Sequence, residues 1–158
     1  MQRLGFDPVV IADMLKQAGN DLYKKGHYPQ ALVKYDEAIT IISQIVFTGD
    51  FRKELAVLFC NRANCLFKLY RWEESLFSAL HSFQQDQHHV KAFYRAGCCF
   101  VKLNNLSNAL EMFKNGLQNM SEMCKKEDVA EFLTEILTVL EVYELLELAF
   151  NKRKLRGK

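Results

Sequence analysis

The sequence has few of the residues that interrupt helices. Its 158 residues include only 2 prolines and 7 glycines. The many tight turns of a β-sandwich or a β-barrel need more of these residues, so their scarcity favours an all-helical fold. Hydrophobic residues make up 49% of the chain and charged residues 25%, which is typical of a globular domain and excludes a disordered chain.

An excess of one charge is also missing, because 21 basic residues face 19 acidic ones. Domains dedicated to nucleic acid usually have a strong basic excess, so this balance argues against that class.

The 5 cysteines form no CxxC pair, and we expect free thiols, no metal site and no cofactor. Free thiols indicate a reducing compartment. The first residues lack a signal-peptide pattern, so we expect a cytoplasmic or nuclear location. Glutamates interrupt the most apolar stretch, 129–150, so we expect no membrane span.

Three segments of the sequence resemble one another: residues 18–39, 62–83 and 96–117. The third segment follows the second at a distance of 34 residues, and the first precedes the second by ten residues more. A 34-residue period is that of tetratricopeptide (TPR) repeats, and the chain resembles this family. Small residues recur at two positions of each unit, where two helices must touch. These residues are Gly19, Ala63 and Gly97 at the first position, and Ala31, Ser75 and Ala109 at the second.

The resemblance implies a single all-α domain over residues 1–158, a right-handed α-solenoid of three helix hairpins and a long C-terminal capping helix. We expect repeats at about 12–45, 56–89 and 90–123, an insertion at 46–55 and the capping helix at about 128–153. The insertion could lengthen both flanking helices or form a loop. The inward stripe of the capping helix is expected to contain Phe132, Leu133, Ile136, Leu137, Leu140 and Tyr143.

Further apolar residues of the capping helix are expected off the inward stripe: Val139, Val142, Leu146 and Phe150. A helix that only caps a solenoid needs one apolar face. The surplus predicts self-association through this helix, or a contact with another part of a longer chain.

Charge is sorted among the expected helices. The first helices of repeats two and three, at 56–69 and 90–103, contain no acidic residue. Their basic residues are Arg62, Lys68, Lys91, Arg95 and Lys102. In a solenoid of this kind the first helices line a concave groove. We therefore predict a positive groove that selects an acidic peptide or a free carboxylate.

Five of the expected groove residues resemble the two-carboxylate clamp of TPR co-chaperones: Lys16, Asn20, Asn61, Lys91 and Arg95. Lys16 and Asn20 lie four residues apart, as do Lys91 and Arg95, so each pair shares a helix face. That family binds the C-terminal Glu-Glu-Val-Asp tails of the ninety- and seventy-kilodalton heat-shock chaperones. The resemblance implies that Lys16, Asn20 and Asn61 hold the main-chain carboxylate. It implies that Lys91 and Arg95 hold the terminal aspartate side chain and nearby backbone, and that Lys68 makes a further peptide contact.

Two other interpretations remain open at this stage. The chain could be a TPR scaffold for another acidic or helical partner, with the clamp residues incidental. It could also be one domain of a larger protein, such as an isomerase, a phosphatase or a ubiquitin ligase. Within the chain itself no nucleophile, base and orienting group are brought together by sequence position, so we do not expect an enzyme. The spacing of residues does not tell which chaperone class is preferred.

Overall fold

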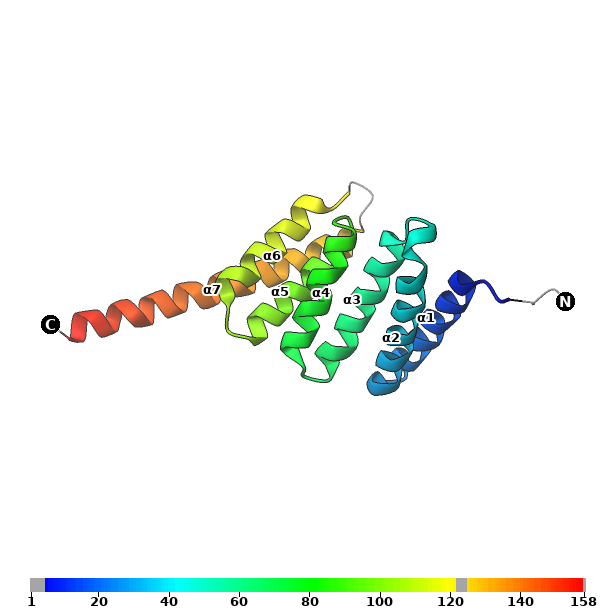
Figure 1. Cartoon of the computed structure of the whole chain (residues 1–158). Coiled ribbons are helices and arrows are strands. Elements are labelled where there is room, and N and C mark those ends of the chain that lie inside the picture. The colour runs from blue at the N-terminus through cyan, green and yellow to red at the C-terminus, as the bar shows by residue number, and fades with distance from the viewer. Residues whose placement is uncertain (1–4, 122–124, 158) are drawn as a thin grey trace.

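The computed structural model describes residues 5–121 and 125–157 (Figure 1). This part of the chain consists of seven α-helices and one 3-10 turn, in the order α1 (Pro8–Lys24), α2 (Tyr28–Ile45), η1 (Val46–Thr48), α3 (Arg52–Lys68), α4 (Trp72–Gln85), α5 (Val90–Lys102), α6 (Leu106–Asn119) and α7 (Lys126–Arg156). Cys60, Cys65, Cys98 and Cys99 are free thiols, as expected, whereas Cys124 lies outside the described residues. None of the described helices is both long enough and apolar enough to cross a membrane.

The ends of the helices follow local sequence signals. Asp7 caps α1, since its carboxylate accepts a hydrogen bond of 2.9 Å from the backbone N–H of Val9. Prolines stand in the first turns of α1 and α2, where a missing N–H costs little. The turn inside each hairpin contains one residue with left-handed backbone, at Gly26, Tyr70 and Asn104, with φ of 80°, 60° and 59°. These residues occupy the same repeat position, so the three hairpins turn in the same way.

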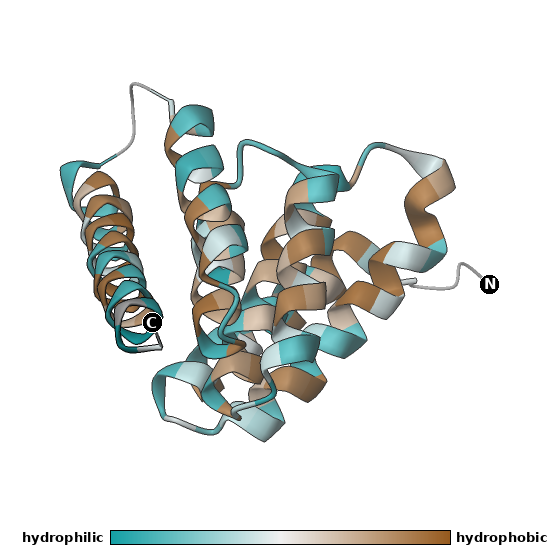
Figure 2. Cartoon of the chain, turned by 90° about the vertical axis from the view of Figure 1, so that its left-hand side faces the viewer, coloured by the Kyte–Doolittle hydropathy of each residue, from teal (hydrophilic) through white to brown (hydrophobic). Residues whose placement is uncertain are grey.

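Consecutive helices pack side by side, which produces a solenoid (Figures 1 and 2). The hairpins are α1 with α2, α3 with α4, and α5 with α6, and α2, α4 and α6 each contact the next helix in the chain. In the first and third hairpins, a glycine on one helix packs against an aromatic ring on the other. Gly19 of α1 lies against the ring of Tyr35 on α2, and Gly97 of α5 lies against the ring of Phe113 on α6.

In the middle hairpin, the contact between the two helices is formed by smaller residues. Ala63 of α3 and Ala79 of α4 are completely buried and belong to one cluster. Ala79 holds the repeat position of Tyr35 and Phe113, so an alanine pair replaces glycine against an aromatic ring. The small residues predicted at the first position, Gly19, Ala63 and Gly97, therefore lie at the contact between the two helices of each hairpin. Those predicted at the second position, Ala31, Ser75 and Ala109, are completely buried.

The insertion between the first two hairpins lengthens both flanking helices, which is one of the two outcomes expected from the sequence. The helix α2 has 18 residues against 14 in α4 and α6, and α3 has 17 residues against 13 in α5. After α2 the chain forms η1, and α3 begins at Arg52. Asp50 accepts hydrogen bonds from the backbone N–H and the guanidinium of Arg52, which hold the pKa of its carboxyl well below the usual value, at about 2. The first groove helix of the middle hairpin thus includes Glu54, so it is not free of acidic residues as the range 56–69 indicated.

The inward stripe of α7 differs from the expected one. Phe132 and Val139 are buried, and Ile136 and Tyr143 pack beside them against α5 and α6. The placement of Val139 off the stripe was wrong, since its side chain is 2% exposed. Three leucines expected on the stripe are exposed instead: Leu133, Leu137 and Leu140. The stripe follows spacings of four, three and four residues, and the adjacent leucine row has similar spacing, so periodicity alone did not separate them.

Candidate functional site: the face of α1, α3 and α5

An amide pair connects the first helices of hairpins one and two. The Asn20 side-chain oxygen accepts a hydrogen bond of 2.6 Å from the Tyr35 hydroxyl and one of 3.3 Å from the Asn61 amide nitrogen. Burial raises the pKa of Tyr35, so its hydroxyl is protonated and donates at neutral pH. Because both neighbours donate to the oxygen, the orientation of the Asn20 amide is fixed. Its NH₂ group is left to donate to a ligand.

Lys16 lies one turn before Asn20 on α1. Its ammonium is 3.0 Å from the Asp13 carboxylate, and its side chain is 27% exposed. Asp13 is the more exposed partner of the pair. Such an ion pair near the surface contributes little stability, so an incoming carboxylate can take the place of Asp13 at Lys16.

Arg95 is held by two residues of α3. Its Nε donates a hydrogen bond of 2.7 Å to the Asn64 side-chain oxygen, and its guanidinium carbon lies 4.2 Å from the centre of the Phe67 ring. These contacts fix the plane of the guanidinium and use Nε–H, which leaves the two terminal nitrogens to donate. Burial raises the pKa of Tyr23 on α1, and the positive charge of Arg95 opposes this rise. The guanidinium is therefore near a residue of α1 as well.

Lys91 stands in the first turn of α5 and is exposed. Burial raises the pKa of the Cys60 thiol on α3 to about 11, and both Arg95 and Lys91 oppose this shift. The two basic residues of α5 therefore act on the same part of α3, next to Asn61 in sequence. Lys68 is exposed in the last turn of α3, seven residues after Asn61.

Two cavities open along this face. The smaller, about 170 Å³, lies at the amide pair, and each of its lining side chains carries a polar group: Asn20, Tyr23, Lys24, Tyr35, Asn61 and Asn64. The larger, about 400 Å³, is mainly apolar and adjoins Lys16, lined by Val9, Ala12, Asp13, Lys16, Ile42, Lys53, Glu54, Val57 and Leu58. A cavity with several amide donors suits a carboxylate, and the neighbouring apolar cavity suits an aliphatic side chain. Over residues 5–121 and 125–157, no cluster of His, Cys, Asp and Glu is suited to a metal ion.

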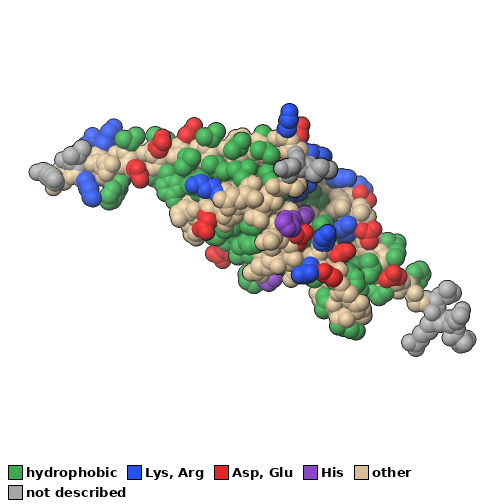
Figure 3. Space-filling view, turned by 90° about the horizontal axis from the view of Figure 1, so that it is seen from above, with side chains coloured by type: hydrophobic (Ala, Val, Ile, Leu, Met, Phe, Trp, Pro, Cys, Tyr) green, Lys and Arg blue, Asp and Glu red, His purple; other side chains and the backbone are tan. Residues whose placement is uncertain are grey.

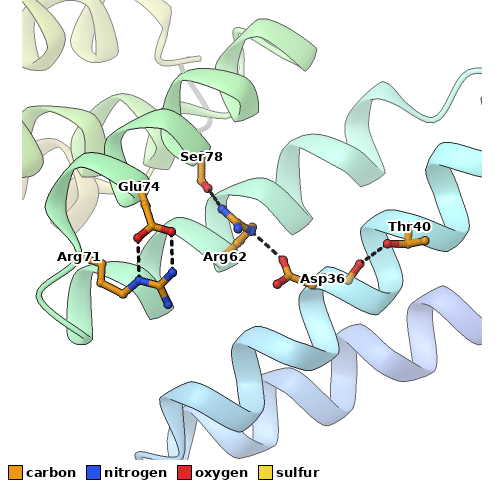
Figure 4. A network of polar contacts seen from close by, with 6 residues as sticks. All are labelled: Asp36, Thr40, Arg62, Arg71, Glu74 and Ser78. Atoms are coloured by element: carbon orange, nitrogen blue, oxygen red, sulfur yellow. Dashed lines mark hydrogen bonds and ion pairs between the residues drawn. The ribbon is translucent and has the colours of Figure 1, made fainter.

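Arg62 does not belong to this face, which corrects its assignment to the groove charges (Figure 4). Its Nε donates 2.7 Å to Asp36 of α2 and its Nη1 donates 2.5 Å to Ser78 of α4. Arg62 therefore joins the second helices of hairpins one and two. Successive helical residues are rotated by about 100°, so the neighbour of a groove residue points elsewhere.

The residues of the site that were not identified from the sequence include Tyr35, Asn64 and Phe67. Asn64 had a usable signal, because it follows Asn61 by three residues and so shares its helix face. Phe67 follows Asn64 by another three residues. The role of Tyr35 had no local signal, since its hydroxyl acts on a residue of the preceding helix.

Two curated human proteins resemble the chain over part of its length. It is 35% identical over 88 residues to TPR and ankyrin repeat-containing protein 1, a stretch that covers 56% of this chain and 3% of that protein. It is 29% identical over 109 residues to Tetratricopeptide repeat protein 12, covering 69% of this chain and 14% of that protein. The chain thus spans a small part of either relative. No protein-family model matches it.

Solved structures of two domains of RPAP3 have a similar fold. One is the first TPR of Spaghetti (RPAP3) bound to HSP90 peptide SRMEEVD, with a TM-score of 0.71 and 21% identity, covering 89% of this chain and 98% of that one. The other is the second TPR domain of human RPAP3 in complex with HSP70 peptide SGPTIEEVD, with a TM-score of 0.68 and 26% identity, covering 84% of this chain and 98% of that one. The likeness extends over most of the described helices.

Proposed function

We propose that this chain, which is a tetratricopeptide-repeat domain, binds the acidic C-terminal tail of heat-shock chaperones that end in Glu-Glu-Val-Asp. The observation that carries the proposal is the fixed amide of Asn20, whose NH₂ group lies at a cavity that is also lined by Lys24, Asn61 and Asn64. Arg95 of α5 is bonded to Asn64 of this lining. The two RPAP3 domains, which were solved with peptides ending in EEVD, support this choice of partner.

In this proposal the main-chain carboxylate of the tail binds at this cavity. The NH₂ groups of Asn20 and Asn61 donate to it, and Lys16 leaves Asp13 to supply the positive charge. Charge-assisted hydrogen bonds of this kind are worth about 1.5–3 kcal/mol each. Two neutral amides and one ammonium avoid the repulsion that a purely cationic site would have when empty.

The side chain of the terminal aspartate binds Lys91 and Arg95. Because Nε of Arg95 is occupied by Asn64, the aspartate is bound through the terminal nitrogens of the guanidinium. The preceding valine has the apolar cavity beside Lys16 as a place for its side chain. An internal acidic stretch has only one of the two carboxylates at this position, so the site selects a chain end. We expect micromolar affinity, about −8 kcal/mol, because a short peptide loses its freedom on binding.

The direct test compares two forms of one peptide. Calorimetric titration with a free-acid peptide ending in Glu-Glu-Val-Asp is expected to give micromolar affinity. The C-terminal amide of the same peptide, which keeps every side chain, is expected to bind at least tenfold more weakly. A tenfold change corresponds to about 1.4 kcal/mol, and the loss of even one such contact costs at least that much. Equal binding of the acid and the amide would refute the proposal.

A second prediction concerns Tyr35. Tyr35→Phe keeps the ring that packs on Gly19 but removes the hydroxyl that orients Asn20. We expect about fivefold weaker binding of the free-acid peptide, from the loss of roughly 1 kcal/mol of hydrogen bonding. The fluorescence anisotropy of a labelled peptide would measure it. Thr40→Val is the control, since its hydroxyl donates to the backbone oxygen of Asp36 on its own helix. Unchanged affinity in Tyr35→Phe would mean that Asn20 needs no fixed orientation.

A further inference from the structure

The second half of α7 extends beyond the solenoid as a helical arm (Figures 1 and 3). Among the described residues, Tyr143 is the last apolar side chain of α7 that packs against the core. Four large apolar side chains follow on the arm and are exposed: Leu145, Leu146, Leu148 and Phe150. An isolated helix of this length is marginal in water, and apolar residues exposed along it indicate a missing partner.

The arm continues the stripe by which α7 packs on the solenoid. Phe132, Ile136, Val139 and Tyr143 are followed by Leu146 and Phe150, so the spacing alternates between four and three residues along the whole helix. This alternation gives a 3.5-residue period, which is the pattern of a helix that packs along another helix. The solenoid covers the first part of the stripe, whereas Leu146 and Phe150 are 56% and 60% exposed.

The charges of the arm specify the direction of a partner helix. Its beginning is acidic, with Glu141, Glu144 and Glu147, and its end is basic, with Lys152, Arg153, Lys154 and Arg156. A parallel copy of the arm would place acidic residues beside acidic ones. An antiparallel copy places the acidic part of each arm beside the basic part of the other, which is the favourable arrangement.

We propose that the arms of two copies of this chain pack antiparallel, with the two-fold axis near residue 148. In this register Leu146 of each copy packs against Phe150 of the other, and Tyr143 packs against Arg153. Glu141 and Glu144 then lie level with the basic end of the second arm. The solenoids lie at opposite ends of the paired helices, so the face of α1, α3 and α5 stays open in both copies.

The paired segment is short, which sets the strength of the association. Only the residues from about 141 to 155 overlap, so the interface falls in the small size class of weak, transient contacts. We expect a dimer with a dissociation constant of tens of micromolar or weaker. Dimerisation would then respond to concentration and present two peptide-binding faces in one particle. It does not depend on the proposed peptide ligand.

Sedimentation equilibrium on the whole chain, from about 5 to about 500 µM, tests the proposal in the expected range of affinity. The mass should rise from monomer toward dimer. Leu146→Glu should lower the association at least tenfold. Leu148→Glu is the matched control, because Leu148 is 59% exposed on the same helix but lies about 200° around it, away from the stripe. A monomer at every concentration, or a larger loss in Leu148→Glu, would overturn the proposal. Both variants change exposed residues, and circular dichroism checks that they remain folded.

The relative direction of the two arms is tested by cross-linking variants in which one residue of the arm is replaced by cysteine. A mixture of Leu146→Cys and Phe150→Cys proteins should cross-link between the two variants faster than either variant links to itself. Fastest linking of each variant to itself would indicate parallel arms and would overturn the antiparallel arrangement. The unmodified chain measures the background from its own cysteines.

Discussion

Replacing Arg95 with alanine is expected to weaken binding of the free-acid Glu-Glu-Val-Asp peptide by at least 30-fold, about 2 kcal/mol. The guanidinium is already held by Asn64 and by the ring of Phe67, so little freedom is lost when the aspartate binds. The alanine variant loses both the positive charge and the fixed orientation of the guanidinium.

Arg95→Lys separates these two contributions. Lysine keeps the charge but cannot donate through Nε to Asn64 while presenting two further nitrogens. We expect an intermediate loss of about fivefold, near 1 kcal/mol. Arg71→Ala is the matched control, because Arg71 is an exposed arginine directly before α4 that pairs with Glu74 in the first turn of that helix. Anisotropy titration measures all three variants. A loss in Arg71→Ala as large as that in Arg95→Ala would mean that only the total charge matters.

The second large effect concerns the fit between Gly97 and Phe113. Phe113 is completely buried, so Phe113→Ala should lower the free energy of unfolding by about 3–5 kcal/mol through the cavity it leaves. Gly97→Ala should lower it by about 1–3 kcal/mol, because the new methyl group collides with the Phe113 ring. Each loss is large relative to the stability of a typical domain.

The double variant tests whether the two residues act as a pair. It recreates in the third hairpin the alanine pair of the second hairpin, Ala63 and Ala79, so its loss should be clearly smaller than the sum of the single losses. Urea denaturation followed by circular dichroism measures the four proteins of the cycle. Additive losses would show that the close approach of α5 and α6 does not depend on this contact.

Local features of the fold were predictable because their causes lie within a few residues. The cap at Asp7, the prolines at the helix starts and the small residues at the hairpin contacts act on their own helix or its neighbour. The inward face of α7 was not predictable in the same way. Val139 and the leucine row at 133, 137 and 140 are both compatible with a helical stripe, and only the shape of α5 and α6 selects between them.

For the candidate site, the sequence predicted which residues could donate hydrogen bonds better than it predicted which residues they contact. Lys16, Asn20, Asn61, Lys91 and Arg95 were identified through their resemblance to the carboxylate clamp, and their joint action on a ligand remains a prediction. Arg62 was counted with them because composition does not resolve the direction of a side chain. Its partners, Asp36 and Ser78, lie 26 and 16 residues away in the chain. Contacts between residues this far apart in the sequence depend on how the hairpins stack, and a local sequence pattern does not predict that stacking.

The central claim is that side-chain amides of α1 and α3 bind the free end of another polypeptide. The most direct measurement is an NMR titration that follows the side-chain NH₂ signals of Asn20, Asn61 and Asn64. With the free-acid peptide these signals should shift together and saturate at micromolar concentration, and with the C-terminal amide they should remain nearly unchanged. Saturable binding that leaves the three signals in place, with shifts on other helices instead, would contradict the account.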